Sequence, residues 1–109
     1  MTEEHALMNS IQAVLSMYCT MFRVNVGKGF TKDGRYFSTG VPVGFSDLFG
    51  FRNKDGIAVF IEVKTKTGRV SLQQKRFLEA MQSAGAIAGV CRSTEDALIL
   101  IGAVRKHNS

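Results

Sequence analysis

The segment that most constrains this chain is IAVFIEV, residues 57–63, which is apolar except for Glu62 and is followed directly by Lys64. A run of this length and composition is typical of a strand buried on both faces. An ionised carboxylate inside such a strand costs several kcal/mol unless a partner compensates it. Because side chains alternate along a strand, Glu62 and Lys64 share one face. The segment therefore predicts a central strand with a compensated charged site.

The bulk composition limits the chain to one domain, residues 1–109, with 45% hydrophobic residues and a single proline. Its longest apolar runs are far shorter than a membrane span requires. The first residues, MTEEHALMNS, are acidic where a secretory signal would be basic, so we expect a cytoplasmic location. Cys19 and Cys91 have no metal-type spacing, and we expect both to be small buried residues rather than a disulfide or a zinc site.

The charge of the chain is basic and concentrated in its middle. The net charge is +5, and residues 23–76 contain 11 Lys or Arg against 4 Asp or Glu. Such a segment favours a polyanionic partner such as nucleic acid. The alternative is a soluble surface that is simply basic, since charge alone specifies neither fold nor chemistry.

Periodicity and turn residues predict helices and strands in the order α-β-β-β-α-β-α, with room for one more strand in a Gly-rich loop. Thr2, Ser71 and Ser93 stand where helix N-caps are expected, and Ser71-x-x-Gln74 and Ser93-x-x-Asp96 have the form of capping boxes. We expect a mixed β-sheet flanked by helices rather than a doubly wound sheet. The helices are predicted at 5–21, 71–84 and 92–106, the strands at 22–26, 45–51, 57–64 and 86–91, and the loop at 27–44.

The turn between the second and third of these strands brings a third charged residue to the site. If the turn centres on Lys54-Asp55, Asp47 lies opposite Glu62; if it centres on Asp55-Gly56, Asp47 lies opposite Lys64. Both registers place Asp47, Glu62 and Lys64 on one face of the sheet.

Two carboxylates on neighbouring strands need compensation. At about 5 Å they repel each other by about 3 kcal/mol at an effective dielectric constant near 20. Oxygen ligands of this kind suit Mg²⁺ or Mn²⁺, which keep several water molecules. The alternative is a cross-strand ion pair with Lys64, or a pair of exposed acids at the rim of the sheet.

The wider context of these residues carries a family resemblance. From about Thr39 to Ala97 the chain reads TGVPVGFSDLFGF, then DGIAVFIEVKTKTGRVSLQQ, and finally GAIAGVCRSTEDAL. These motifs closely resemble the VRR-NUC family of the PD-(D/E)XK nuclease superfamily, with a weaker match through the first helix and FRVNVGKG. The resemblance implies a restriction-endonuclease-like core. Ser46 stands where the family usually has proline.

The resemblance also implies roles for individual residues. Asp47 and Glu62 would be metal ligands, helped by the backbone carbonyl of Val63, and Lys64 would activate water and stabilise charge on the phosphate. Gln74 would position water or phosphate, although its place in a capping box offers a purely structural alternative. An acid on the first helix would complete the site, and we expect Glu4 ahead of Glu3.

The function implied by the resemblance is Mg²⁺- or Mn²⁺-dependent hydrolysis of phosphodiester bonds by a homodimeric DNA endonuclease. Its substrate would be branched DNA such as a Holliday junction, and a phage-encoded member would act in the cytoplasm of a host cell. A non-catalytic nucleic-acid-binding module on the same fold is the main alternative, and a basic partner for an acidic protein is the third. The candidate phosphate contacts are Lys28, Lys32, Arg35, Lys66, Arg69, Lys75 and Arg76.

Overall fold

The computed structural model describes residues 2–24, 28–38 and 40–106 and has three helices and six strands in these ranges. Two of the strands form a small separate hairpin. The remaining elements follow the chain in the expected order α-β-β-β-α-β-α, which is thus confirmed. The elements are α1 (Glu3–Leu15), β1 (Cys19–Arg23), β2 (Lys28–Phe30), β3 (Tyr36–Ser38), β4 (Leu48–Arg52), β5 (Ala58–Val63), α2 (Leu72–Ser83), β6 (Ile87–Cys91) and α3 (Thr94–Leu100).

The main sheet is mixed and has the strand order β1-β4-β5-β6. Strands β1, β4 and β5 pair antiparallel, whereas β5 and β6 pair parallel. A parallel pair needs a long crossover, which helix α2 supplies between β5 and β6. Strand β5 is therefore central, and its five side chains from Val59 to Val63 are all buried.

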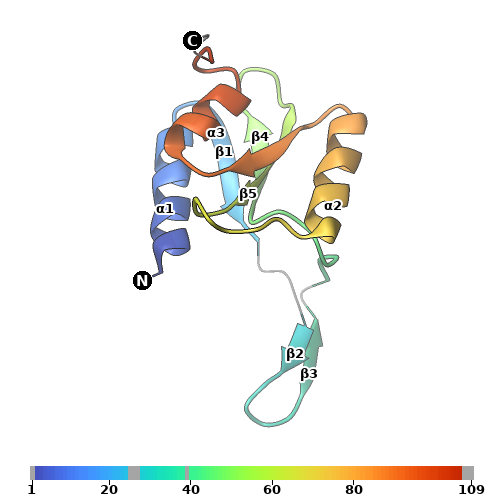
Figure 1. Ribbon diagram of the computed structural model, residues 1–109. Helices are drawn as coiled ribbons and strands as arrows, with labels where there is room; N and C mark the ends of the chain where they lie inside the picture. The colour runs from blue at the N-terminus through green and yellow to red at the C-terminus, as the bar shows by residue number, and fades with distance from the viewer. Residues whose placement is uncertain (1, 25–27, 39, 107–109) are drawn as a thin grey trace.

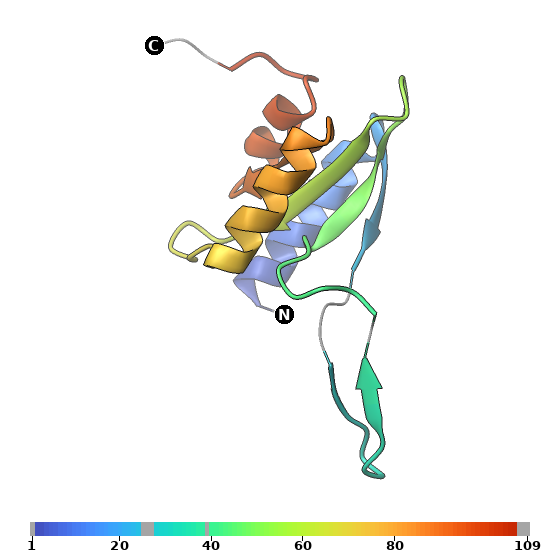
Figure 2. The same cartoon turned by 90° about the vertical axis from the view of Figure 1, so that its right-hand side faces the viewer.

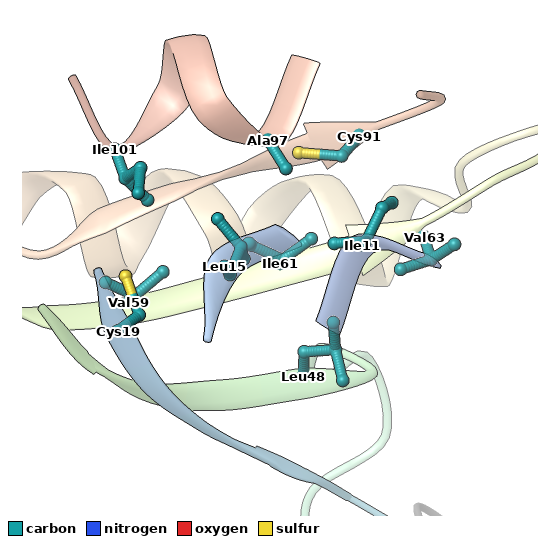
Figure 3. Close-up of a cluster of buried hydrophobic side chains, with 10 residues drawn as sticks. All are labelled: Ile11, Leu15, Cys19, Leu48, Val59, Ile61, Val63, Cys91, Ala97 and Ile101. Carbon is teal, nitrogen blue, oxygen red and sulfur yellow. The ribbon is translucent and has the colours of Figure 1, made fainter. Parts of the chain in front are cut away.

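Helices cover the sheet from both sides (Figure 1). Helices α1 and α3 pack on one face, where the main core gathers around β5. Figure 3 shows this core, whose members are Ile11, Leu15, Cys19, Leu48, Val59, Ile61, Val63, Cys91, Ala97 and Ile101. Both cysteines are buried free thiols, as the sequence predicted.

Helix α2 packs on the opposite face over a smaller core of Phe60, Leu78 and Ala88. Phe49 stacks on Phe60 with 4.9 Å between the ring centroids, so the aromatic layer continues from β5 onto β4. On the outer part of this face the side chains of Phe22, Phe49 and Phe51 remain 56%, 38% and 41% exposed. The β1–β4 half of this face is thus apolar and open.

The β4–β5 hairpin settles the register that the sequence left open. Leu48 pairs with Ile61 and Phe49 with Phe60, so the next position places Asp47 opposite Glu62. The alternative with Asp47 opposite Lys64 is wrong. The N–H of Arg52 donates to the carbonyl of Ile57, which closes a four-residue loop instead of a two-residue turn. Gly56 adopts a φ of 72°, a conformation that favours glycine, and this ends the loop.

Several element boundaries differ from the predicted ones. Helix α1 begins after its expected cap Thr2 but ends at Leu15, and β1 starts earlier than predicted, at Cys19. Strand β4 begins at Leu48 rather than Phe45. The N–H of Val63, which a longer β4 would have bonded through its backbone, instead donates to the side chain of Asp47. Helix α2 begins after Ser71 and ends before Gly85, close to the prediction.

The expected capping box of α3 forms only in part. The N–H of Asp96 donates to Ser93 Oγ at 3.0 Å, but Asp96 Oδ2 accepts from the N–H of Arg92 instead of that of Ser93. The carboxylate therefore fixes the residue before the cap. None of the helices in the described ranges has the length and apolar character that crossing a membrane requires.

Strands β2 and β3 form a separate two-stranded hairpin that projects from the body of the molecule (Figure 2). Gly34 adopts a φ of 86° in its turn, and its N–H donates to the carbonyl of Thr31 at 3.0 Å. Directly after β1, the N–H of Val24 donates to the carbonyl of Asp47 at 2.9 Å. This bond joins the end of β1 to the residue that precedes β4.

Candidate metal and nucleic-acid site

The centre of the candidate site is Glu62, a carboxylate at the end of the central strand with only 2% of its surface exposed. Within the part of the chain that the structure describes, Glu62 Oε2 is buried without a hydrogen-bond partner. Burial, a hydrogen bond that only the protonated carboxyl group can donate to Asp47, and the charges of Asp47 and Glu4 together raise the pKa of Glu62 to about 8, and Lys64 opposes them. A buried acid with a spare oxygen is costly for a metal-free protein, which makes this carboxylate a candidate ligand.

Asp47 lies next to Glu62 from the neighbouring strand. Its Oδ2 accepts the N–H of Val63 at 3.0 Å, a donor that the β4 backbone would have paired had the strand begun earlier. Its own carbonyl accepts the N–H of Val24. Asp47 is therefore held both by the residue that follows β1 and by β5, and its half-buried carboxylate cannot turn away without losing the bond to Val63.

Gln74 links helix α2 to Glu62. Its Oε1 accepts the N–H of Ser71 at 2.8 Å, and its backbone N–H donates to Ser71 Oγ at 3.1 Å, which completes the capping box. Its Nε2 then donates to Glu62 Oε1 at 3.1 Å. The structural role that the sequence offered for Gln74 is thus present, because the cap uses the amide oxygen, while the amide nitrogen bonds the Glu62 carboxylate. The role toward water or phosphate stays a prediction.

Lys64 and Glu4 complete the charged surroundings. Lys64 Nζ lies 3.9 Å from Glu62 Oε1, and its side chain is 15% exposed. Glu4, half-buried in the first turn of α1, is near enough for its charge to raise the pKa of Glu62, whereas Glu3 is exposed. The five predicted catalytic residues thus come from α1, from β5 and the residue that follows it, from α2, and from the residue that precedes β4.

The predicted phosphate contacts lie on three segments. Lys66 and Arg69 are exposed on the loop between β5 and α2, and Lys75 and Arg76 are exposed on α2 itself. Lys32 and Arg35 are exposed in the hairpin turn, where Arg35 lies 3.6 Å from Asp33. Lys28 begins β2, and its side chain lies outside the described part of the chain.

Side chains alone do not complete a metal cage. In residues 2–24, 28–38 and 40–106, no three His, Cys, Asp or Glu side chains form a group that could hold an ion. A cavity of about 340 Å³ lies elsewhere, at the β4–β5 turn and the end of α3, and contains none of the predicted site residues. Any ion at the site would therefore rest on Asp47 and Glu62, with backbone oxygen and water completing its coordination.

Sequence reasoning gave no role to Arg92, which the structure places at the end of β6 with its guanidinium against the loop that follows Lys64. Arg92 stands inside the motif GAIAGVCRS that carried the resemblance. Its position in that motif was the only indication in the sequence, because contacts between a guanidinium and backbone carbonyls leave no residue pattern.

The raised pKa of Glu62 predicts how the stability of the metal-free protein depends on pH. Between about pH 4.5 and pH 8 the folded protein holds a proton that the unfolded chain releases, so its stability falls as pH rises through this range. The contribution of this group reaches about 1.4 kcal/mol per pH unit. We expect Glu62→Gln, which cannot ionise, to remove this contribution. Urea unfolding in EDTA at several pH values measures it, and equal pH slopes for the two proteins would contradict it.

Comparisons with known proteins agree with this fold. The family model described as the VRR-NUC domain matches residues 3–95. A solved structure described as a VRR_NUC domain superposes with a TM-score of 0.65 at 20% sequence identity, covering 93% of this chain and 96% of that one. A comparison with curated proteins finds no match to this chain.

The fold and the site define an α/β domain of the nuclease-type superfamily, with a mixed sheet that carries an Asp, a Glu and a Lys at one end of its central strands. The chain belongs to the VRR-NUC domain family.

Proposed function

We propose that this protein is a metal-dependent DNA endonuclease that hydrolyses phosphodiester bonds in branched DNA such as Holliday junctions. The observation that carries the proposal is the buried oxygen Glu62 Oε2, which has no partner in the described structure, in a carboxylate that lies beside Asp47 and whose other oxygen is 3.9 Å from Lys64 Nζ. A binding module has no use for carboxylates that face a polyanion. A metal-dependent hydrolase requires them.

The residues present fit a Mg²⁺ or Mn²⁺ ion. Asp47 and Glu62 supply the carboxylate oxygens, and Mg²⁺ is commonly bound by only one or two carboxylates and retains water in its other positions. The N–H of Val63 points to Asp47, and the N–H and C=O of a strand residue lie on the same edge, which supports its carbonyl as a further ligand. When bound, such an ion polarises a phosphoryl oxygen and lowers the pKa of a coordinated water molecule.

The other side chains have separate tasks in this proposal. Lys64 stabilises the negative charge that develops on the phosphate during hydrolysis. Gln74 fixes the orientation of the Glu62 carboxylate through its bond to Oε1 and leaves Oε2 available as a ligand. Glu4 adds negative charge beside the pair and would act through a bound water.

The substrate class follows from charge and shape. Exposed basic side chains lie on the β5–α2 loop, on α2 and in the turn of the hairpin, and they suit contacts with the phosphate backbone. The hairpin itself projects from the body of the molecule (Figure 2). The wide separation of hairpin and body favours DNA whose arms diverge. A homodimer would present two sites for two strands, and the open apolar face with Phe22, Phe49 and Phe51 is a surface that a second copy would bury. We place this activity in the cytoplasm, where DNA of a cell or of an infecting phage is available.

The test is incubation of purified protein with four-way junctions, flaps and linear duplex in Mg²⁺, Mn²⁺ or EDTA. We expect cleavage of the junction with either metal and none in EDTA, with binding that weakens steeply as salt increases because counterions are released. Light scattering on the same sample reports whether the protein is a dimer. Metal-independent binding without any cleavage would instead establish the non-catalytic module.

A further inference from the structure

Arg92 binds the loop that joins β5 to α2. Its Nη1 donates to the carbonyls of Thr65 at 2.6 Å and Gly68 at 2.8 Å and lies 3.5 Å from that of Lys66. These carbonyls converge on one guanidinium nitrogen, which is a permanently charged donor. The loop thus closes around the end of β6.

The same loop is folded tightly against Lys64. The N–H of Gly68 donates to the carbonyl of Thr65 at 3.1 Å, and a Cβ added at Gly68 would lie 3.5 Å from the Cβ of Lys64. The backbone N–H of Lys64 donates to the carbonyl of Cys91, the residue before Arg92, at 3.2 Å. The backbone of Lys64 is therefore held by Cys91, the last residue of β6. Its side chain packs against a loop that Arg92 holds by hydrogen bonds.

The backbone of Arg92 is itself held in place by helix α3. The backbone N–H of Arg92 donates to Asp96 Oδ2 at 2.8 Å, and Asp96 lies in the first turn of α3. The exposed side chains of Lys66 and Arg69 are carried by the fastened loop. Release of the guanidinium would free the loop, and with it the packing around Lys64, without touching the carboxylates.

We propose that Arg92 is a positioning residue for the reaction: by holding the carbonyls of the β5–α2 loop it keeps Lys64 in place at the scissile phosphate. The proposal rests on the proposed nuclease function. Arg92 acts through the loop and does not contact the reacting atoms.

The first test needs no catalysis. Trypsin cleaves after lysine and arginine, so cleavage after Lys66 and Arg69 reports how firmly the loop is held. We expect Arg92→Ala to be cut at these two bonds at least about five times faster than wild type. Arg105→Ala, which removes the same charge from an exposed arginine outside the site, should match wild type. Equal cleavage of Arg92→Ala and wild type would overturn the proposal.

The second test is a double-mutant cycle with saturating junction DNA. Arg92→Ala should lower kcat about tenfold, as loss of a residue that orients a catalytic group commonly does. In a Lys64→Ala background the same change should have almost no effect on kcat, because the side chain to be positioned is gone. An undiminished effect would mean that Arg92 acts on the DNA itself and would overturn the proposal.

Arg92→Lys provides a variant that keeps the charge and a donor. We expect it to regain most of the trypsin resistance and kcat, since an ammonium can donate to the carbonyls of Thr65 and Gly68. If Arg92→Ala fails to fold, the comparison of Arg92→Lys with wild type still tests the proposal. A folded Arg92→Lys protein that trypsin cuts in this loop as fast as it cuts a denatured control would contradict it. If wild type cleaves no DNA, the proposed function fails, whereas the trypsin result still decides whether Arg92 holds the loop.

Discussion

Glu62→Gln is expected to reduce DNA cleavage by about a thousandfold or more in saturating Mg²⁺, and Asp47→Asn should do the same. Both substitutions keep the size of the side chain and remove the negative charge that would hold the ion, and loss of metal catalysis is worth several kcal/mol of barrier. Neither should harm folding, since Glu62→Gln replaces a buried acid that has an unsatisfied oxygen and a raised pKa. Single-turnover cleavage of a labelled junction measures the rates.

Two controls make this result decisive. Glu79→Gln makes the same chemical change on the exposed surface of α2 and should cleave at the wild-type rate. In EDTA both site variants should bind junction DNA at least as tightly as wild type, because removal of a carboxylate cannot weaken attraction to phosphate. The nuclease proposal would be abandoned if either variant, correctly folded, cut DNA as fast as the control.

Gly50→Ala is expected to cost about 4 kcal/mol or more of unfolding free energy, a large part of what a domain of this size possesses. A Cβ at Gly50 would overlap the carbonyl oxygen of Thr20 and lie 2.8 Å from the Cα of Met21. Both are backbone atoms of β1, so relief requires β1 to move away from β4. Urea unfolding measures the loss.

Gly89→Ala is the matched control in another strand of the sheet. Its added Cβ would meet Leu100 Cδ1 at 3.1 Å, the far end of a flexible side chain that can turn aside. We expect a cost of about 1 kcal/mol or less. Similar unfolding midpoints for Gly50→Ala and Gly89→Ala would show that β1 does not approach β4 as closely as the structure has it.

The elements with strong local patterns were predicted well. The apolar run around Glu62 is strand β5, and helix α2 begins after Ser71 and ends before Gly85. These features depend on alternation and on capping, which act over a few residues. Boundaries were missed where a tertiary contact competes with the local pattern, as at Asp47, whose side chain takes the N–H of Val63 in place of a strand partner.

The register of the β4–β5 hairpin shows the limit of a local argument. Sequence alone left Asp47 opposite either Glu62 or Lys64, because both Lys54-Asp55 and Asp55-Gly56 are plausible turn centres. The structure uses a four-residue loop, in which Arg52 contacts Asp55 through its side chain and Ile57 through its backbone. The loop therefore depends on a side chain outside the turn residues, which turn preferences do not describe.

By itself, the sequence predicted that Asp47, Glu62 and Lys64 share one face, since alternation with period two gives that result in both turn registers that it offered. It could not determine that Glu62 is buried with one oxygen that has no hydrogen-bond partner, or that Gln74 both caps α2 and bonds that carboxylate. Nor could it determine that Arg92 bonds the loop after Lys64. Those contacts join residues 12 to 27 positions apart, and only the packing of helices on the sheet brings such distant side chains within bonding distance.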